Sequence, residues 1–233
     1  MEKSQVEQLN KKVEGLSPVE VIKYFVSEFS PVALSSSLGL EDQVLTHIVA
    51  KNNIEADVFT LDTGRLFYET YDLIDKTEKR YKIKIKTYFP SPSEVEKMVY
   101  EKGINLFYES IENRKLCCNV RKIQPLRRAL SNYKVWICGL RKEQSVTREN
   151  IQTVEWDELN GLLKINPIIN WTEQDVWNFV NENNVPYNVL HKKNYPSIGC
   201  QPCTRAIVEG EDVRAGRWSW ENPDTKECGL HKK

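Results

Sequence analysis

Strand-like and helix-like segments alternate along this chain, and this alternation constrains the fold more than any other feature of the sequence. The strand-like segments are short and apolar or alternate in polarity, whereas the helix-like segments carry apolar residues at helical spacing. Strands are expected over residues 31–35, 57–61, 83–89, 133–138 and 165–168. Helices are expected over residues 17–29, 40–51, 65–81, 93–102, 119–130 and 172–183. The alternation predicts an open, mostly parallel α/β sheet with helices on both faces, which binds ligands at the carboxyl ends of its strands.

The length of the chain fits a single domain over residues 1–233, because a chain of 233 residues can bury an adequate core without disulfides. The periodicity fades from about Tyr195, and residues 204–233 are expected to form a functional C-terminal segment. The polar start lacks the apolar core of a signal peptide, and no apolar run is long enough to span a membrane, which predicts a cytoplasmic protein. Basic and acidic residues number 33 each, which argues against nucleic-acid binding.

Four of the six cysteines fall into two pairs. Cys117 and Cys118 are adjacent, and a disulfide between them would be strained because their Cα atoms lie only about 3.8 Å apart. Cys200 and Cys203 form a Cys-x-x-Cys sequence. Cytoplasmic cysteines stay reduced, so the pairs indicate a metal site, and their spacing leaves zinc and an iron–sulfur cluster about equally open, ahead of a redox pair. Cys138 lies within an expected strand and is assigned to the core.

Cys228 differs from the other cysteines because it lies five residues before the end of the chain, where chains are usually mobile. Gly229 adds backbone freedom, and Lys226 and His231 can favour the thiolate, which is the nucleophilic form of cysteine. The residues alone fit a mobile nucleophile, and they fit an incidental exposed thiol slightly better.

Small and charged residues follow several expected strands, where a sheet of this kind binds its ligand. Residues 35–42 place small side chains before an expected helix, so that backbone N–H groups can approach an anion. Residues 61–65, 139–148 and 210–220 add hydrogen-bonding groups and arginines that can bind phosphate as forks. Each segment alone is a weak signal. Residues 35–42 can be a capped helix start, a tight turn with a helix cap explains residues 61–65 better than a binding loop, and arginines are usually solvated surface charges. Together the segments indicate a pocket for a small polyanion. The candidate ligand-binding residues are Ser35, Ser36, Ser37, Gly39, Asp62, Thr63, Gly64, Arg65, Gly139, Arg141, Arg148, Arg214 and Arg217.

Seven segments, in a fixed order, carry a resemblance to a known enzyme family. They are SSSLGLED from Ser35, LDTGR from Leu61, CCNVRKIQPL from Cys117, GLRKEQSVTR from Gly139, GCQPCTR from Gly199, GEDVRAGRWSWE from Gly210 and ECGLH from Glu227. With these segments the chain resembles the assimilatory adenylyl-sulfate reductases, of the family that also contains phosphoadenylyl-sulfate reductases. The two cysteine pairs match its cluster-bearing branch. The resemblance implies an adenine nucleotide α-hydrolase-like fold.

The resemblance also implies roles for individual residues. The residues implied as ligands of a [4Fe-4S] cluster are Cys117, Cys118, Cys200 and Cys203. Cys228 matches the nucleophile, and Lys122 matches a lysine between the cluster and the substrate. Arg214 and Arg217 match arginines that bind the substrate anion, and His231 matches a histidine near the sulfate. The strand-end loops described above match the nucleotide pocket of the family.

The implied reaction is the reduction of adenylyl sulfate (APS) to sulfite and AMP in assimilatory sulfate reduction. It passes through an S-sulfocysteine on Cys228, which reduced thioredoxin or a glutaredoxin-like protein releases. Alternatives are the same chemistry on phosphoadenylyl sulfate (PAPS) or on both nucleotides, an ATP pyrophosphatase, and a zinc-knuckle RNA-binding module. The loop at residues 35–42 lacks the Ser-Gly-Gly run of ATP pyrophosphatases. The sequence does not determine the oligomeric state and is compatible with a homo-oligomer.

Overall fold

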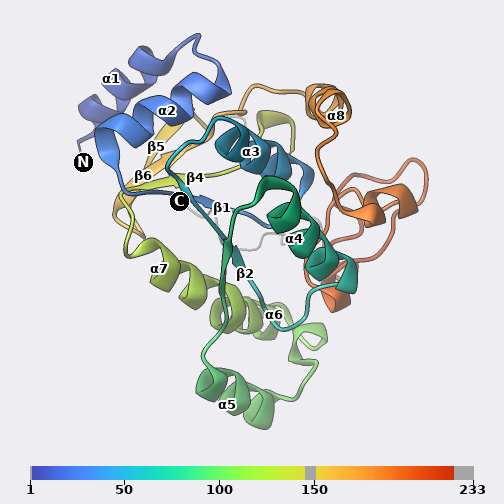
Figure 1. The fold of residues 1–233 in the computed structure, drawn as a ribbon. Coiled ribbons are helices and arrows are strands. Elements are labelled where there is room, and N and C mark those ends of the chain that lie inside the picture. The colour runs from blue at the N-terminus through green and yellow to red at the C-terminus, as the bar shows by residue number, and fades with distance from the viewer. Residues whose placement is uncertain (1, 145–150, 223–233) are drawn as a thin grey trace.

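The computed structural model describes residues 2–144 and 151–222. Within these residues, six strands form one sheet in the order β3-β2-β1-β4-β6-β5 (Figure 1). The strands are β1 Val32–Ser35, β2 Asp57–Leu61, β3 Ile85–Tyr88, β4 Val135–Ile137, β5 Val154–Asp157 and β6 Leu162–Ile165. Every neighbouring pair is parallel except β5 and β6, so the predicted, mostly parallel sheet is confirmed.

Helices cover both faces of this sheet, as the alternation predicts. They are α1 Lys3–Val13, α2 Pro18–Phe29, α3 Leu40–Lys51, α4 Tyr68–Tyr81, α5 Pro92–Lys102, α6 Ile111–Cys118, α7 Gln124–Leu130 and α8 Glu173–Glu182. On one face α2 and α3 contact β1, and α8 packs against α3. On the other face α7 contacts β2 and β3. Figure 1 shows α2 and α3 above the strands and α7 below them.

The two faces of the sheet bury alternate residues of the same strands. Val32 and Leu34 of β1 join the core under α2 and α3, whereas Ala33 between them joins the core under α7. In β4, Trp136 faces α7 and its two neighbours face the opposite core. Because successive side chains of a strand point to opposite faces, a strand covered on both sides must be apolar throughout. This requirement explains the apolar runs that predicted these strands.

The structure corrects the last predicted strand. β6 ends at Ile165, where the predicted strand 165–168 begins, and β5 lies outside every predicted strand. Lys164 interrupts the apolar run of β6, yet it is only 6% exposed. Its ammonium group lies 3.6 Å from the carboxylate of Glu155 on β5. A buried charge needs such a partner, and the partner lies on another strand, so the local pattern of β6 does not reveal it.

The helices also differ from the prediction in places. α1 and α6 lie outside the predicted helices, and α4 begins at Tyr68 rather than at residue 65. The hydroxyl of Ser110 caps α6 by accepting a hydrogen bond from the Asn113 N–H at 3.1 Å. A π-helical turn, Asn119–Ile123, then joins α6 to α7. The predicted helix 119–130 is therefore the second part of a helical run that begins at Ile111, whose mostly polar first turns hide it from a search for apolar periodicity.

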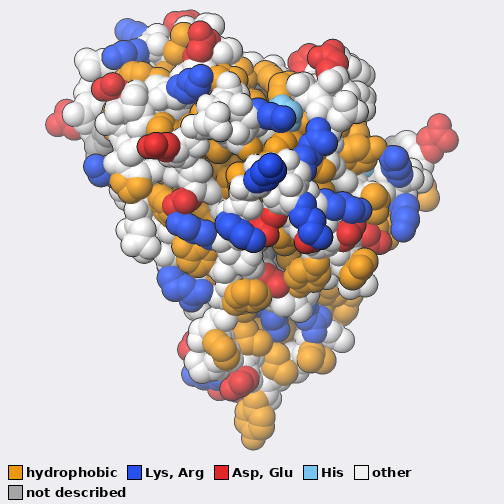
Figure 2. Space-filling view, in the orientation of Figure 1, with side chains coloured by type: hydrophobic (Ala, Val, Ile, Leu, Met, Phe, Trp, Pro, Cys, Tyr) orange, Lys and Arg blue, Asp and Glu red, His pale blue; other side chains and the backbone are white. Residues whose placement is uncertain are grey.

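Within the two described ranges, every helix is too short or too polar to cross a lipid bilayer. Figure 2 shows that Lys and Arg side chains gather across the middle of one face, although the formal net charge of the chain is zero. Charge that is balanced overall can therefore still be locally concentrated, as a site for a small polyanion requires.

Candidate functional site

A cavity of about 380 Å³ lies at the carboxyl ends of β1, β2 and β4. The loops after these strands line it, together with residues 196–199 and several residues between 212 and 218. Its volume suits a small molecule, and its place at the strand ends is the expected one for this kind of sheet. The predicted site residues that line the cavity are Ser35, Ser36, Ser37, Gly39, Thr63, Lys122, Gly139, Arg141, Arg214 and Arg217.

The loop after β1 folds back onto the first turn of α3. The N–H group and the hydroxyl of Ser37 both donate to Asp42 Oδ2, at 2.6 Å each. The N–H of Leu38, a residue with φ of 62°, donates to Ser36 Oγ at 3.2 Å. Burial raises the pKa of Asp42 to about 6, against the lowering effect of the two bonds from Ser37. The N–H group of Ser37 is thus already bonded to a carboxylate, although the sequence suggests that it approaches an external anion.

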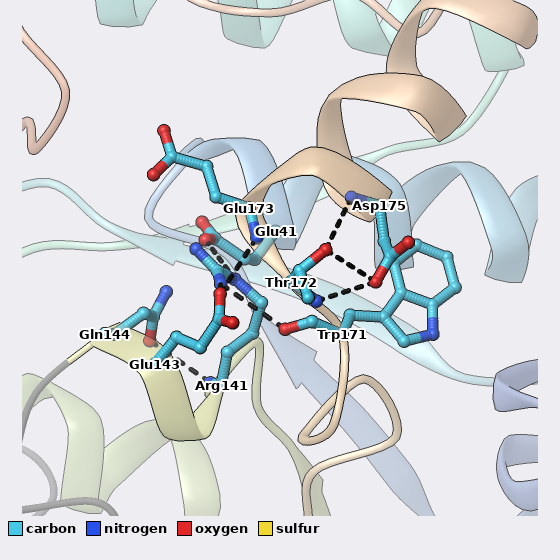
Figure 3. Close-up of polar contacts among 8 residues, drawn as sticks. All are labelled: Glu41, Arg141, Glu143, Gln144, Trp171, Thr172, Glu173 and Asp175. Atoms are coloured by element: carbon cyan, nitrogen blue, oxygen red, sulfur yellow. Dashed lines mark hydrogen bonds and ion pairs between the residues drawn. The ribbon is translucent and has the colours of Figure 1, made fainter.

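Arg141 follows β4 and contacts two carboxylates and a backbone carbonyl (Figure 3). Its Nε donates to Glu41 Oε1 at 2.9 Å, and its Nη1 donates to Glu143 Oε2 at 3.4 Å. The carbonyl of Trp171 accepts a further bond from Nη1, and the whole residue is only 5% exposed. The guanidinium that the sequence suggests as a phosphate fork therefore binds carboxylates of the protein itself.

The predicted residues after β2 divide between the cavity and its surroundings. Thr63 lines the cavity, whereas Asp62, Gly64 and Arg65 are not among its lining residues. Asp62 Oδ1 accepts the Gly64 N–H at 2.7 Å and a tyrosine hydroxyl of α4 at 2.9 Å, so it stabilises the turn. The guanidinium of Arg65 donates to residues 104 and 105, at 2.9 and 3.1 Å. In this structure Asp62 and Arg65 therefore support the loop rather than face the cavity.

Three of the four paired cysteines lie together beside the cavity. Cys117, Cys200 and Cys203 pack in one apolar cluster with Trp218, which is 1% exposed. The hydroxyl of Thr63 lies 3.2 Å from Cys200 Sγ, which connects the loop after β2 to the Cys-x-x-Cys turn. All three cysteines are free thiols. The fold thus brings one cysteine of the first pair and both cysteines of the second to one place. Cys117, Cys200 and Cys203 are called the cysteine group below.

Arginines on α6 and on the turn after it flank the sulfurs at a spacing of four residues. Arg121 follows Cys117 by four positions and Arg114 precedes Cys118 by four, so each guanidinium lies on the helix face of its cysteine. Burial raises the pKa of the Cys117 thiol, and Arg121 opposes this effect. Burial likewise raises the pKa of Cys203 to about 12. Neither arginine is among the predicted site residues, although the four-residue spacing is visible in the sequence.

Arg217 lines the cavity and lies near Cys203 of the cysteine group. It is 7% exposed, and its Cζ lies 4.7 Å from the centre of the Trp218 ring. A Cβ atom at Gly199 would lie 2.6 Å from this Cζ, so a side chain at position 199 would require the guanidinium to move. Lys122 and Arg217 both act electrostatically on the Cys203 thiol. Positive charge therefore adjoins the cysteine group.

The described chain is anchored close to its C-terminal end. Arg114 of α6 donates from Nε and Nη2 to the two carboxylate oxygens of Glu221, at 2.8 Å each. The two side chains are 1% and 3% exposed. Three predicted site residues, Cys228, His231 and Arg148, lie outside the described residues. The ion pair fixes the chain seven residues before Cys228 to the helix that carries the first cysteine pair.

Comparisons of sequence identify similar proteins over most of the chain. The phosphoadenosine phosphosulfate reductase domain matches residues 31–206. The chain is 50% identical over 215 residues to the adenosine 5′-phosphosulfate reductase of Allochromatium vinosum, which covers 92% of this chain and 84% of that protein. It is 46% identical over 222 residues to the protein of the same name from Rhizobium meliloti, with coverages of 95% and 84%.

Comparisons of structure agree with the sequence matches. The crystal structure of phosphoadenylyl-sulfate (PAPS) reductase from Candida auris superposes with a TM-score of 0.77 at 29% identity, covering 89% of this chain and 98% of that one. Candida glabrata FMN adenylyltransferase superposes with a TM-score of 0.55 at 14% identity, covering 96% of this chain and 85% of that one. The second likeness concerns the fold alone, and it agrees with the predicted adenine nucleotide α-hydrolase-like fold.

Proposed function

Since the chain belongs to the phosphoadenosine phosphosulfate reductase family, we propose that it reduces adenylyl sulfate to sulfite and AMP in assimilatory sulfate reduction. The observation that carries this proposal is the cavity, where the strand-end loops of a nucleotide-binding fold meet a group of cysteines. Relatives at 46–50% identity that are named adenosine 5′-phosphosulfate reductase support the choice of substrate. The protein is thus an oxidoreductase that acts on a sulfur group.

In the first stage of the proposed reaction, the Cys228 thiolate attacks the sulfate sulfur of adenylyl sulfate. A bond forms between Cys228 Sγ and that sulfur, the bond to the bridging phosphate oxygen breaks, and its electron pair leaves with AMP. The enzyme then carries an S-sulfocysteine. Glu221, which is bound to Arg114, lies seven residues before Cys228, and seven residues span at most about 25 Å. The connectivity of the chain therefore limits Cys228 to within about 25 Å of Glu221.

In the second stage, a thiolate of reduced thioredoxin attacks the Cys228 sulfur and sulfite departs. The mixed disulfide that results is resolved by the second thiol of thioredoxin, which restores the Cys228 thiolate. The two thiols of the partner thus supply both electrons. A glutaredoxin-like protein can play the same part, and we place the reaction in the cytoplasm, where such proteins keep thiols reduced. Residues 204–233 act in this scheme as the active-site segment of a single domain.

Basic side chains of the cavity have an electrostatic role in the proposal. Lys122, Arg214 and Arg217 line the cavity, and their charges offset the negative charge on the sulfuryl oxygens during transfer. The family pattern adds His231 to the same neighbourhood. The loops after β1 and β4 hold the nucleotide, so the sulfuryl group is directed toward the cysteine group.

The cysteine group and Cys118, the neighbour of Cys117 in the sequence, are the four residues that would hold a [4Fe-4S] cluster, and four thiols fit such a cluster as a donor set. Trp218 Nε1 is buried with no acceptor among the described residues, and the ring packs with Cys117 and Cys203, so a cluster sulfur would give it a partner. Within residues 2–144 and 151–222 no three His, Cys, Asp or Glu side chains converge on a position for a single ion. A cluster held by four thiolates does not require such convergence. When bound, it supplies a fixed charge beside Lys122 and ties α6 to the Cys200 turn.

The proposal predicts that the holoenzyme converts adenylyl sulfate to equal amounts of sulfite and AMP when reduced thioredoxin is present. Sulfite is measured with a thiol-reactive dye and AMP by chromatography. Without thioredoxin, the yield of AMP should stop at one molecule per enzyme, because the S-sulfocysteine is not discharged. Consumption of ATP with release of pyrophosphate, and no sulfite from adenylyl sulfate, would instead support an ATP pyrophosphatase.

A further inference from the structure

The cavity has two sides of opposite charge. Its basic side carries Lys122, Arg214 and Arg217, which outnumber Asp212, the carboxylate of the same segment. Its acidic side consists of Glu41, Asp42, Glu143 and Glu173. The basic side adjoins the cysteine group, since Lys122 and Arg217 act on Cys203. The Thr63 hydroxyl contacts Cys200, so the cysteine group lies beside the end of β2. The acidic side surrounds the end of β4, and β1 separates the two strands in the sheet. Two strand spacings correspond to about 10 Å, which is the scale of one nucleotide.

Arg141 does not give the acidic side a positive surface. Its guanidinium contacts the carboxylates of Glu41 and Glu143, and Figure 3 shows both of these side chains directed toward it. Burial lowers the pKa of His191, which also lines the cavity, so its ring is neutral at pH 7 despite the opposing effect of Glu41. Among the described residues that line this side, carboxylates therefore outnumber cations.

The part of the acidic side formed by Glu41 and Asp42 is a closely packed wall. A Cβ atom added to Gly139 would lie 2.5 Å from Asp42 Oδ1 and 3.0 Å from Glu41 Cβ, so the end of β4 already touches the first turn of α3. The Ser37 hydrogen bonds hold the Asp42 carboxylate in place. The wall thus cannot withdraw to accept a bulky anion without breaking these contacts.

The two charged sides determine how a nucleotide is oriented in the cavity and which nucleotide the cavity accepts. The phosphosulfate, which carries the negative charge, belongs on the basic side beside the cysteine group, so the nucleoside reaches the acidic side. We infer that the acidic side, chiefly Glu41, excludes a phosphate from the nucleoside end of the substrate and thereby selects adenylyl sulfate over phosphoadenylyl sulfate. The inference rests on the proposed function and adds the determinant of its specificity.

The test compares two product nucleotides, AMP and adenosine 3′,5′-bisphosphate, because their binding does not require turnover. Dissociation constants are measured by titration calorimetry on the full-length holoenzyme. The wild-type protein should bind AMP more tightly. The Glu41→Gln variant removes one carboxylate charge and loosens its bond to Arg141, so the preference for AMP should fall about five- to tenfold. The matched control, Glu96→Gln on the exposed surface of α5, should keep the wild-type ratio.

The inference is overturned if the wild-type protein binds the two nucleotides equally, or if Glu41→Gln leaves their ratio unchanged. If Glu41→Gln does not fold, Glu143→Gln takes its place, since the Glu143 side chain is 55% exposed and tolerates change. Glu143→Gln must then lower the preference for AMP over adenosine 3′,5′-bisphosphate by a smaller factor. Failure of the proposed function would give a different result, because the protein would release no sulfite from adenylyl sulfate. A preference for AMP that falls in Glu41→Gln would still support the acidic side as the determinant of nucleotide selectivity.

Discussion

Replacement of Cys203 by serine is expected to release most of the iron and to abolish the turnover of adenylyl sulfate. Cys203 is 8% exposed and packs with Cys117 and Trp218 beside the cavity. Serine offers a hydroxyl that stays protonated at neutral pH, so it replaces a thiolate ligand poorly. Loss of the cluster would also free α6 from the Cys200 turn and displace the neighbouring cations. Iron content, visible absorbance and sulfite release measure the effect.

Cys138 provides the control for that substitution. Cys138 is 1% exposed and belongs to the sheet core under α7. Burial raises the pKa of its thiol, as it does for Cys203. The two variants therefore make the same substitution at two buried cysteines. The variant Cys138→Ser should keep its iron and lose only some thermal stability, because the new hydroxyl is buried in apolar surroundings. If Cys203→Ser retained full iron and colour, Cys203 would not be a cluster ligand.

Substitution of Arg114 by methionine is expected to have the largest effect on stability. The change leaves the Glu221 carboxylate buried without its cation and removes the guanidinium from the Trp218 ring, 4.7 Å away. Removal of one partner of a buried ion pair costs about 3–5 kcal/mol. For a chain of this size that corresponds to a fall in the melting temperature of about 10 °C. Differential scanning fluorimetry of the holoenzyme measures it.

Arg205 is the matched control for Arg114. It binds Glu211 with the same two-pronged geometry, at 2.7 and 2.8 Å, but the two side chains are 44% and 28% exposed. Exposed ion pairs contribute little, so Arg205→Met should leave the melting temperature nearly unchanged. Equal, small shifts in the two variants would show that the Arg114 pair does not anchor the C-terminal part of the described chain.

Local features of the sequence predicted the sheet because its central strands are apolar throughout. The prediction was wrong for β6, where the counter-charge of Lys164 comes from Glu155 on the neighbouring strand. The site likewise depends on contacts between segments that are distant in the sequence. The cysteine pairs are visible as motifs, and the fold brings Cys117, Cys200 and Cys203 together.

Contacts between distant parts of the chain decide what the motifs cannot. Arg141 suggests a phosphate fork when it is considered alone, but Glu41, 100 positions earlier, occupies its Nε. Glu221 is 107 positions from Arg114, and nothing in either local pattern pairs them. Both pairs depend on packing, which a pattern of residue types along one segment does not contain.

The proposed reaction begins when Cys228 attacks the sulfate sulfur of adenylyl sulfate. The most direct test is the intact mass of the holoenzyme after incubation with adenylyl sulfate and no reductant, followed by peptide mapping. The account predicts a gain of one SO3 group on Cys228, its removal by reduced thioredoxin, and no gain in Cys228→Ser. An iron-loaded protein that releases AMP and sulfite but never carries the group, or a Cys228→Ser protein that remains active, would contradict it.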